Sequence, residues 1–496
     1  MAQELIAAID LGSNSFRLEI GRVVDDQIYI RDSLKEPVRL AAGLSENRML
    51  DEEACARTLS ALSRFHERLA GYPPENVRAV ATNTFRVAKN APQLLAEAEK
   101  ALGFPIEIIA GREEARLIYL GVSHAMPDPS RQTLVVDIGG GSTEFIIGKS
   151  LKPLVLESLY MGCVGYSLRF FPDGEVDKQR FKEAELAARK EIQGITRAYC
   201  KVGWELAVGS SGSARTLCDI LEQNGWSSAG ITRHGLRKLK SLLLKSGNVS
   251  KLELEGLRSE RVPVLAGGLA IMTAIFKEFD LEQMQFSEGA LRLGVLYDLL
   301  GRYHNQDQRD LTVKSFMRRY RLDARQAEQV AQTASALYEQ LNPETGMEED
   351  NDRRFLRWAA LLHEIGISIA HASYHKHSAY IVGNADMPGF SRKDQLRLAQ
   401  LVLGHRGKLE RFGNDAAGDA DWCILLCLRL AVIFHRSRSG RGLPAFSFKR
   451  QGKSFLIGIP GSWLQRHPLT AAALEEEERA QWETVGRKLI VEVSDK

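Results

Sequence analysis

The sequence lacks the features of a membrane, secreted or disulfide-linked protein. No uninterrupted apolar run approaches the roughly 20 residues that a helix needs to cross a bilayer. The N-terminus, MAQELIAAIDLGSNSF, carries an early acid and no basic flank, so we expect no signal peptide. Only 6 of the 496 residues are cysteine, and they are scattered, which indicates reduced thiols in a reducing compartment. These absences predict a cytoplasmic protein.

The sequence also has no excess of one charge. The formal net charge is +3, so the composition predicts no nucleic-acid partner. No GxxxxGK[ST] loop occurs, which excludes a Walker-type nucleotide site. No low-complexity linker interrupts the chain, yet 496 residues are too many for one core. We therefore expect about two to four domains that pack together.

The strongest positive signal is a repeated strand–turn–strand. Residues 10–21 read DLGSNSFRLEIG, residues 137–148 read DIGGGSTEFIIG, and each copy follows an apolar run. Aligned without gaps, the copies match in their chemically informative residues: Asp10 and Asp137, Gly12 and Gly139, Ser15 and Ser142, Gly21 and Gly148. The pattern predicts two hairpins with small-residue tips.

The chemistry of these tips suits phosphate. Glycine lets backbone N–H groups approach an anion closely, and serine or asparagine adds donors. An aspartate at the end of the first strand repels phosphate, so it makes sense as a direct or water-mediated ligand of a divalent cation. Either hairpin alone could be an ordinary turn, but their recurrence in register favours two facing loops that clamp a polyanion and its metal. Each turn leads to a strand, which argues against a Rossmann fingerprint.

These motifs give the sequence a specific resemblance. AIDLGSNSFRL and VVDIGGGSTEF resemble the two phosphate loops of actin-like ATPases, in the form found in the exopolyphosphatase and guanosine pentaphosphate phosphohydrolase family. Further segments resemble that family: ATNTFRVAKN at 81–90, GREEARLIYLGV at 111–122, MGCVGYSLRFF at 161–171, SEGALRLGVLYDLL at 287–300, and the stretch at 361–390. The resemblance runs through nearly the whole chain and is strongest to the long, four-domain exopolyphosphatases.

The fold class implied by this resemblance is α/β. Two actin-like (ribonuclease H-like) domains, residues 1–123 and 124–301, are expected with a cleft between them. The residues agree, because strand patterns alternate with amphipathic helical patterns over both ranges. Strand signals then fade, which predicts an all-α, degenerate HD-like domain at 302–440. Residues 441–496 read strand, strand, helix, strand, which predicts a small α+β C-terminal domain.

Glu114 is the candidate for activating the water that attacks phosphorus. It follows the strand-like PIEIIA, and its helical neighbours at i+3, i+4 and i+7 are small or apolar, so it should face inward. An inward carboxylate at a domain junction needs a reason. Glu113 better fits the simpler role of an acid that favours the helix dipole. In the family, the second Glu of this stretch is the proposed base, and Glu114 holds that position.

Asp137 and Glu144 flank the second Gly-rich turn and complete the catalytic set. Across the predicted hairpin they can converge on one side of its tip, so we assign them to cation binding and to orienting the water. The simpler alternatives are an Asx turn for Asp137 and an exposed strand position for Glu144. Asp10 is expected to be a further carboxylate near the metal.

Other polar groups are expected to bind phosphate. The donors should come from both turns and from an arginine after a strand end: Ser13, Asn14, Ser15, Arg86, Gly140, Gly141, Ser142 and Thr143. Arg17 is weaker, because its strand could point it either way. GSSGSA at 209–214 resembles the turn that approaches adenosine in actin-like ATPases. This turn could simply line the cleft, or it could leave room for the nucleoside part of a nucleotide.

The predicted helical domain contains a histidine group, namely His363, His371, His375, His377 and His405 with Glu364. It looks like a histidine–aspartate metal phosphohydrolase domain that has decayed. The paired His-Asp is here His363-Glu364, and the helix that would bring an upstream histidine has none. Structural histidines or phosphate contacts are therefore favoured over a working metal site.

Basic residues gather late in the chain and could form a distal polyphosphate track: Arg318, Arg319, Arg321, Arg436 and Arg438. Solvated surface is the simpler alternative. A long linear polyanion would need such a track, and its binding would weaken with salt. No base-stacking aromatics are interleaved with these residues, so nucleic acid is not favoured.

The resemblance implies an exopolyphosphatase that releases orthophosphate from the end of inorganic polyphosphate, or alternatively a guanosine pentaphosphate (pppGpp) phosphohydrolase. It also implies Mg²⁺ or another divalent cation, stimulation by K⁺, a homodimer, and no membrane insertion, although peripheral membrane association stays open. A sugar kinase shares the fold but needs an acceptor site that the sequence does not show. An inactive sensor of phosphorylated alarmones is disfavoured by the presence of Glu114, Asp137 and Glu144.

Overall fold

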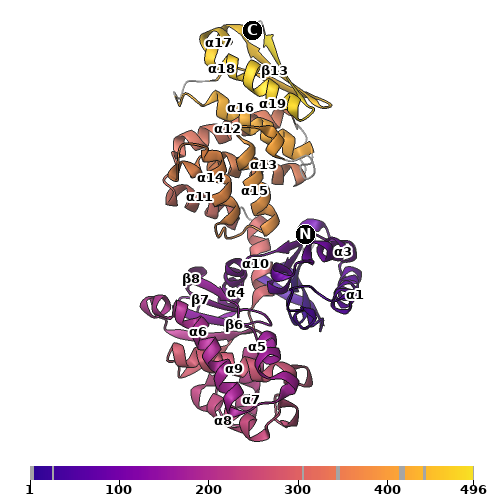
Figure 1. Ribbon diagram of the computed structural model, residues 1–496, viewed down its shortest axis with the longest axis vertical. Helices are drawn as coiled ribbons and strands as arrows, with labels where there is room; N and C mark the ends of the chain where they lie inside the picture. The colour runs from indigo at the N-terminus through magenta and orange to yellow at the C-terminus, as the bar shows by residue number, and fades with distance from the viewer. Residues whose placement is uncertain are drawn as a thin grey trace. The chain divides into compact units, whose positions relative to one another are not determined.

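The computed structural model describes residues 5–24, 27–303, 307–341, 347–412, 419–438 and 443–494. The chain divides into two compact units, residues 1–307 and 308–496 (Figure 1). The first unit holds two β-sheets with their helices, and the second holds a set of helices followed by a small sheet. The finer domain boundaries expected from the sequence stay predictions.

The first sheet has the strand order β3-β2-β1-β4-β5. Strands β1 and β2 form the first predicted hairpin, β3 extends it antiparallel, and β4 and β5 run parallel to β1. Strand β1 is covered on both faces, which explains its nearly continuous apolar sequence. The bounds are β1 Leu5–Leu11, β2 Phe16–Val24, β3 Gln27–Glu36, β4 Val77–Ala81 and β5 Ile106–Ile108.

The second sheet has the order β10-β11-β9-β6-β7-β8. Strands β6 and β7 form the second predicted hairpin, β8 extends it antiparallel, and β9 runs parallel to β6. The bounds are β6 Thr133–Ile138, β7 Thr143–Lys149, β8 Lys152–Leu159, β9 Leu206–Ser210, β10 Ile231–Thr232 and β11 Gln283–Phe286.

The two sheets share one topology. The order β3-β2-β1-β4-β5 corresponds strand for strand to β8-β7-β6-β9-β11, so the sequence repeat is also a repeat of structure. This is the ribonuclease H-like arrangement of actin-like proteins, and the predicted α/β fold is confirmed. Each Gly-rich turn joins the first two strands of its sheet, and therefore lies at the carboxyl end of a central parallel strand.

The helices of the first unit are α1 Glu52–Leu69, α2 Asn83–Val87, α3 Ala91–Leu102, α4 Gly111–Ala125, α5 Cys163–Phe170, α6 Lys178–Val202, α7 Ser211–Gln223, α8 Arg233–Ser246, α9 Val262–Glu278 and α10 Leu291–Tyr303. Helix α1 begins where the Asp51 carboxylate accepts from the Ala54 N–H at 2.7 Å, as an N-cap should.

Helices α4 and α10 pack antiparallel between the two sheets (Figure 1). Helix α4 packs on strands of the second sheet, whereas α10 packs on β1, β2 and β4 of the first. Leu117 lies opposite Gly294, and Gly121 lies opposite Ala290. A Cβ atom at either glycine would overlap the carbonyl oxygen across from it, so the two backbones touch. This helix pair fixes the N-terminal turn of α4, which carries Glu114.

The second unit is mainly helical and ends in a sheet of order β12-β13-β14. One apolar core runs through its helices and its sheet, with Trp482 packing against Trp422 and Phe455. The helices are α11 Gln308–Arg319, α12 Ala324–Leu341, α13 Met347–Leu362, α14 Tyr374–Asn384, α15 Arg392–Gly404, α16 Asp419–Phe434, α17 Gly461–Arg466, α18 Pro468–Ala472 and α19 Arg479–Thr484. The strands are β12 Ser447–Gln451, β13 Ser454–Pro460 and β14 Lys488–Ser494.

One segment of the described chain, Ser259–Glu278, is a helix long and apolar enough to cross a membrane by length and composition. Its most apolar window is 67% buried inside the fold. The helix supplies buried residues to the core of the second sheet, as the central helix of a globular domain does.

Candidate active site

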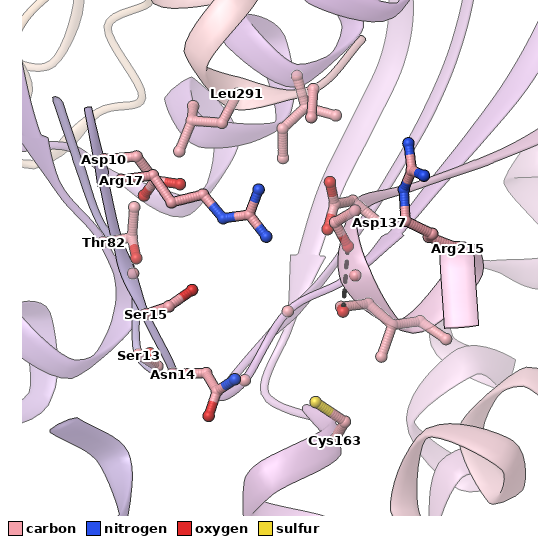
Figure 2. Close-up of a pocket in the computed structure, with 18 of the residues that line it drawn as sticks. Asp10, Ser13, Asn14, Ser15, Arg17, Thr82, Asp137, Cys163, Arg215 and Leu291 are labelled. Atoms are coloured by element: carbon pink, nitrogen blue, oxygen red, sulfur yellow. Dashed lines mark hydrogen bonds between the residues drawn. The ribbon is translucent and has the colours of Figure 1, made fainter. Parts of the chain in front are cut away.

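A cavity of about 350 Å³ lies in the first unit and is lined by both Gly-rich turns, residues 12–15 and 139–142. Figure 2 shows Asp10 and Asp137 on opposite walls of this cavity. The guanidinium group of Arg17 extends into the space between the walls (Figure 2). The structure thus brings the two copies of the repeat to face each other, as the sequence predicted.

Helix α5 holds the second turn in place. The backbone N–H groups of Cys163 and Val164 donate to the carbonyl oxygens of Gly139 and Gly140, at 2.9 and 3.0 Å. In a trans peptide the N–H points away from the C=O, so the following N–H groups point away from α5. They are oriented to receive an anion. A Cβ atom at Gly162 would overlap the Gly140 backbone, so only glycine fits there.

The central strands of both sheets present an aspartate to the cavity. Asp10 on β1 lies opposite Arg17 on β2, whereas Asp137 on β6 lies opposite Glu144 on β7. One copy of the repeat therefore pairs an acid with a base, and the other pairs two acids. Oδ1 of Asp10 is buried and has no hydrogen-bond partner within the described chain. Oδ2 of Asp137 accepts from the Ser210 hydroxyl at 2.6 Å.

These carboxyl groups shift one another's protonation. Burial raises the pKa of Asp10 to about 7, and the charges of Glu114 and Asp137 contribute to the rise. Burial also raises the pKa of Asp137. Glu144 is 1% exposed, and burial together with Glu114 and Asp137 raises its pKa well above the usual value. Neighbouring carboxylates resist ionising together in a low-dielectric site, and a cation relieves that repulsion.

Glu114 lies in the first turn of α4 and is 7% exposed, so the inward orientation predicted from periodicity is confirmed. Its Oε2 accepts from Nη1 of Arg86 at 2.7 Å. The same nitrogen donates to the carbonyl oxygen of Ile109 at 2.9 Å, which fixes the guanidinium. Burial raises the pKa of Glu114, Arg86 opposes the rise, and Asp137 adds to it.

Most of the expected phosphate-binding residues line the cavity, namely Ser13, Asn14, Ser15, Gly140, Gly141 and Ser142. The structure does not bring Thr143 there, because it begins β7 fully buried and its hydroxyl donates to the Met161 carbonyl oxygen at 2.5 Å. Arg86 and Glu144 are not among the residues that line the cavity. Arg86 holds Glu114, and Glu144 accepts from the Ser158 hydroxyl at 2.8 Å.

Cationic side chains that sequence reasoning did not assign also line the cavity: Lys35, Arg215, Arg258, Arg261 and Arg292. Arg215 directly follows GSSGSA, and Arg292 lies within SEGALRLGV, so attention to charge inside these segments could have found them. The other three carry no motif. Burial lowers the pKa of Arg17, and the nearby Arg292 lowers it further. Such crowding of cations suits a ligand with several negative charges.

The carboxylates fit a hard divalent cation. The unpartnered oxygen of Asp10 and the mutual raising of pKa values both indicate missing positive charge. Within the described chain, no three His, Cys, Asp or Glu residues come close enough to hold a metal ion by themselves. Mg²⁺ commonly uses one or two carboxylates together with waters and substrate phosphates. The residues present therefore fit Mg²⁺ that is completed by a phosphate ligand.

The second unit has its own cavity of about 980 Å³, which His363, His371, His375 and His405 line. Nδ1 of His363 lies 2.7 Å from the Ala360 carbonyl oxygen, and Nδ1 of His405 lies 2.6 Å from that of Val402. Burial lowers the pKa of both histidines. Burial thus favours the neutral form of both rings, and each lies within hydrogen-bond distance of the carbonyl oxygen three residues earlier, as a structural histidine can.

The residues of the predicted distal track are exposed on the second unit: Arg318, Arg319, Arg321, Arg436 and Arg438. Arg436 and Arg438 line the cavity of that unit. Arg438 pairs with Glu364 at 2.5 Å and with Asp323 at 3.4 Å. Acids therefore partly neutralise this end of the track.

Comparison with known proteins gives the same fold. The sequence profile of the Ppx/GppA phosphatase family matches residues 20–303, and that of Ppx/GppA phosphatase, domain III, matches residues 308–478. An exopolyphosphatase from Cytophaga hutchinsonii is 26% identical, over 60% of this chain and 97% of that chain, with a TM-score of 0.55. The Aquifex aeolicus member of the Ppx/GppA family is 27% identical, over 60% and 98%, with a TM-score of 0.51.

Two actin-like domains with facing Gly-rich turns around one carboxylate-lined cavity are typical of enzymes that act on phosphate esters or anhydrides. The chain belongs to the Ppx/GppA phosphatase family, whose profile covers more than half of its residues. It is accordingly a hydrolase that acts on phosphoanhydride bonds.

Proposed function

We propose that this hydrolase is an exopolyphosphatase, which releases orthophosphate from the end of inorganic polyphosphate in a metal-dependent reaction. One observation carries the proposal: both Gly-rich turns and several arginines surround buried carboxylates in a single cavity. Hydrolysis of a phosphoanhydride needs a positioned water and neutralised phosphoryl oxygens, without covalent chemistry on the protein. This cavity offers groups for both tasks, and its lining cations suit a chain of phosphates.

Glu114 accepts the proton of the attacking water. Its pKa is raised mainly by burial, and a base works best when its pKa approaches the working pH. Arg86 fixes the orientation of the carboxylate at 2.7 Å and opposes its protonation. As the water oxygen bonds to the terminal phosphorus, its proton passes to Glu114. The anhydride bond breaks, and the shortened chain leaves as a phosphate anion.

The phosphoryl oxygens are received by preorganised donors. The N–H groups of Gly140 and Gly141 are directed away from α5, and donors fixed in advance stabilise developing charge most effectively. The guanidinium of Arg17 extends between the two walls, where it can contact phosphate (Figure 2). A divalent cation held by Asp10 or Asp137 together with waters and substrate oxygens, with the buried Glu144 adding negative charge behind Asp137, would neutralise further charge on these oxygens.

The alternative substrate is guanosine pentaphosphate (pppGpp), converted to the tetraphosphate. The wall formed by α7 and β11 favours it, because it adds non-phosphate contacts to the cavity. The Arg215 guanidinium lies 4.9 Å from the centre of the Phe286 ring, and Ser211 and Gly212 line the cavity beside them. A flat cation on an aromatic ring could contact a ribose or a base.

The test is phosphate release from long-chain polyphosphate and from guanosine pentaphosphate, measured side by side with Mg²⁺. Faster release from polyphosphate, relative to its Michaelis constant, supports the exopolyphosphatase. Faster release from the nucleotide supports the alternative. If neither substrate releases phosphate with any divalent cation, both proposals fail.

Several properties are proposed from the resemblance alone. They are Mg²⁺ as the preferred cation, stimulation by K⁺, a homodimer, and a cytoplasmic location. Titration with each cation, sedimentation in solution and cell fractionation would test them.

A further inference from the structure

A buried ion network adjoins the first turn of α4, which carries Glu114, and Asp298 on α10 lies at its centre. Asp298 accepts from Nη1 of Arg78 at 2.7 Å and from Nη2 of Arg116 at 2.5 Å, and it lies 3.4 Å from Nε of Arg302. Burial alone would raise the pKa of Asp298, but the three guanidinium groups outweigh it and hold the pKa below its usual range. Asp298 is thus an ionised carboxylate inside the fold.

On the α4 side, Arg116 separates two acids that helix packing would otherwise bring together. Leu117 lies opposite Gly294, and the same antiparallel register, one turn further, places Glu113 opposite Asp298. Arg116 donates to Glu113 at 2.7 Å as well as to Asp298. Glu113 is therefore more than the helix-dipole acid expected from the sequence, since it ties the first turn of α4 to α10. Glu114 is the next residue of that turn.

On the side of the first sheet, Arg78 links the Asp298 carboxylate to the segment that carries Arg86, the hydrogen-bond partner of Glu114. Arg78 belongs to β4, which leads into α2 and Arg86. It also donates to Glu107 on β5 at 2.9 Å. Two residues after Glu107, the carbonyl oxygen of Ile109 accepts from Arg86. Both members of the Glu114–Arg86 pair are therefore anchored to elements that meet at Asp298.

A gain in the stability of the fold does not by itself explain why these charged groups are buried together. Buried ion pairs are often no better than well-packed apolar groups of the same size, because desolvation offsets their attraction. The contact of α4 with α10 at Gly121 and Gly294 already joins the helices closely. A network of directional hydrogen bonds adds a fixed rotation of the first turn of α4, which apolar packing does not set as tightly.

We propose that Asp298 is a positioning residue for the reaction. Through Arg116 it orients the turn that carries Glu114, and through Arg78 it orients the segment that carries Arg86, so it sets the 2.7 Å contact between base and guanidinium. Asp298 does not touch the substrate. This inference rests on the proposed role of Glu114 as the base.

The test is Asp298→Asn, which keeps the shape and removes the charge. With Mg²⁺ and the better of the two substrates, kcat should fall by about tenfold to 100-fold, because small misplacement of a catalytic group costs this much. KM should change little, since the phosphate-binding turns are untouched. The acid limb of the pH–rate profile should move to higher pH, because Glu114 separated from Arg86 loses the contact that lowers its pKa.

Glu185→Gln is the matched control. Glu185 is also buried, 6% exposed, and it pairs with Lys240 at 3.0 Å and with Lys277, outside the cavity lining. Burial would raise its pKa, but the two lysines outweigh burial and lower it. This variant should lose stability as Asp298→Asn does, yet keep the kcat, the KM and the pH profile of the parent protein.

Arg116→Lys provides a second variant if Asp298→Asn does not fold. It keeps the charge between Glu113 and Asp298 but loses the fork that binds both at once, so kcat should fall with KM unchanged. The inference is overturned if the folded variants behave like Glu185→Gln in kcat and pH profile. If the parent protein itself releases no phosphate, the proposed function fails first, which distinguishes the two failures.

Discussion

Asp137 and Glu144 lie directly opposite each other on β6 and β7, so two buried acids form one cross-strand pair. Like charges in this arrangement destabilise a sheet. At the same place in the first copy of the repeat, Asp10 faces Arg17, so an acid is paired with a base. The second copy therefore carries an imbalance of charge beside its phosphate-loop turn, where a bound cation would offset it.

Glu114→Gln should abolish turnover while polyphosphate binding stays nearly unchanged. The amide cannot accept the proton of the water, and general bases typically contribute about 100-fold or more. Phosphate release and equilibrium binding of polyphosphate measure the two effects, with Glu185→Gln as a control that should stay active. A variant that keeps more than about a tenth of the parent rate would contradict the assignment.

Asp137→Asn and Glu144→Gln should each depress activity and raise the Mg²⁺ concentration needed for half-maximal rate. Each change removes one negative charge from the proposed cation site, which weakens attraction for Mg²⁺. Glu282→Gln, at an exposed acid, serves as the control and should leave the titration unchanged. Equal half-saturation in all four proteins would place the ligands elsewhere.

In the metal-free protein, Asp10 should make a contribution to stability that is lost as pH rises from about 4 through 7. Asp10 has a folded pKa of about 7, above its unfolded value near 3.9, so over this range the folded state binds more protons than the unfolded state. Each unit of pKa difference corresponds to about 1.4 kcal/mol. Thermal midpoints with a chelator present measure the trend.

Asp10→Asn should flatten that pH dependence, and Mg²⁺ should raise the midpoint more at pH 8 than at pH 6, because the ionised carboxylates bind it. Asp298 acts in the opposite direction, but only as pH falls below about 4, since its folded pKa is lowered. An Asp10→Asn slope equal to that of the parent would contradict the raised pKa of Asp10.

Gly162→Ala should lower kcat/KM by about 100-fold, since the added Cβ must displace the Gly140 backbone and with it the phosphate-loop donors. Gly165→Ala is the matched control. It lies three residues further along, within α5, and an added Cβ there meets nothing within 4 Å. Similar activity in the two variants would show that the turn is not held by α5 in a geometry that catalysis needs.

Charge reversal at Arg318, Arg319 and Arg321 should raise KM for long polyphosphate far more than for a short oligomer. A longer chain makes more electrostatic contacts, and salt screens them, so the gap should narrow at high ionic strength. Lys393→Glu, at an exposed position of the same unit, controls for a general change of charge. If long and short substrates suffer equally, the three arginines are only solvated surface.

The sequence by itself determined the parts of this protein that depend on local pattern. The repeat at 10–21 and 137–148 predicted both hairpins and the places of Asp10 and Asp137, because a period of two with a Gly-rich tip leaves few other structures. Helical periodicity also predicted that Glu114 faces inward, since residues three and four apart share one face.

Only the tertiary structure decided which distant groups meet. Lys35, Arg258 and Arg261 reach the cavity from segments without a motif, and Asp298 meets Arg78 across 220 positions of sequence. Periodicity reports that a side chain is buried, but not against what. Thr143 shows this limit, because it continues the phosphate-loop motif yet turns into the core where β7 begins. The packing of α4 and α10 between the two sheets decides which side chains meet, and that packing depends on the whole chain.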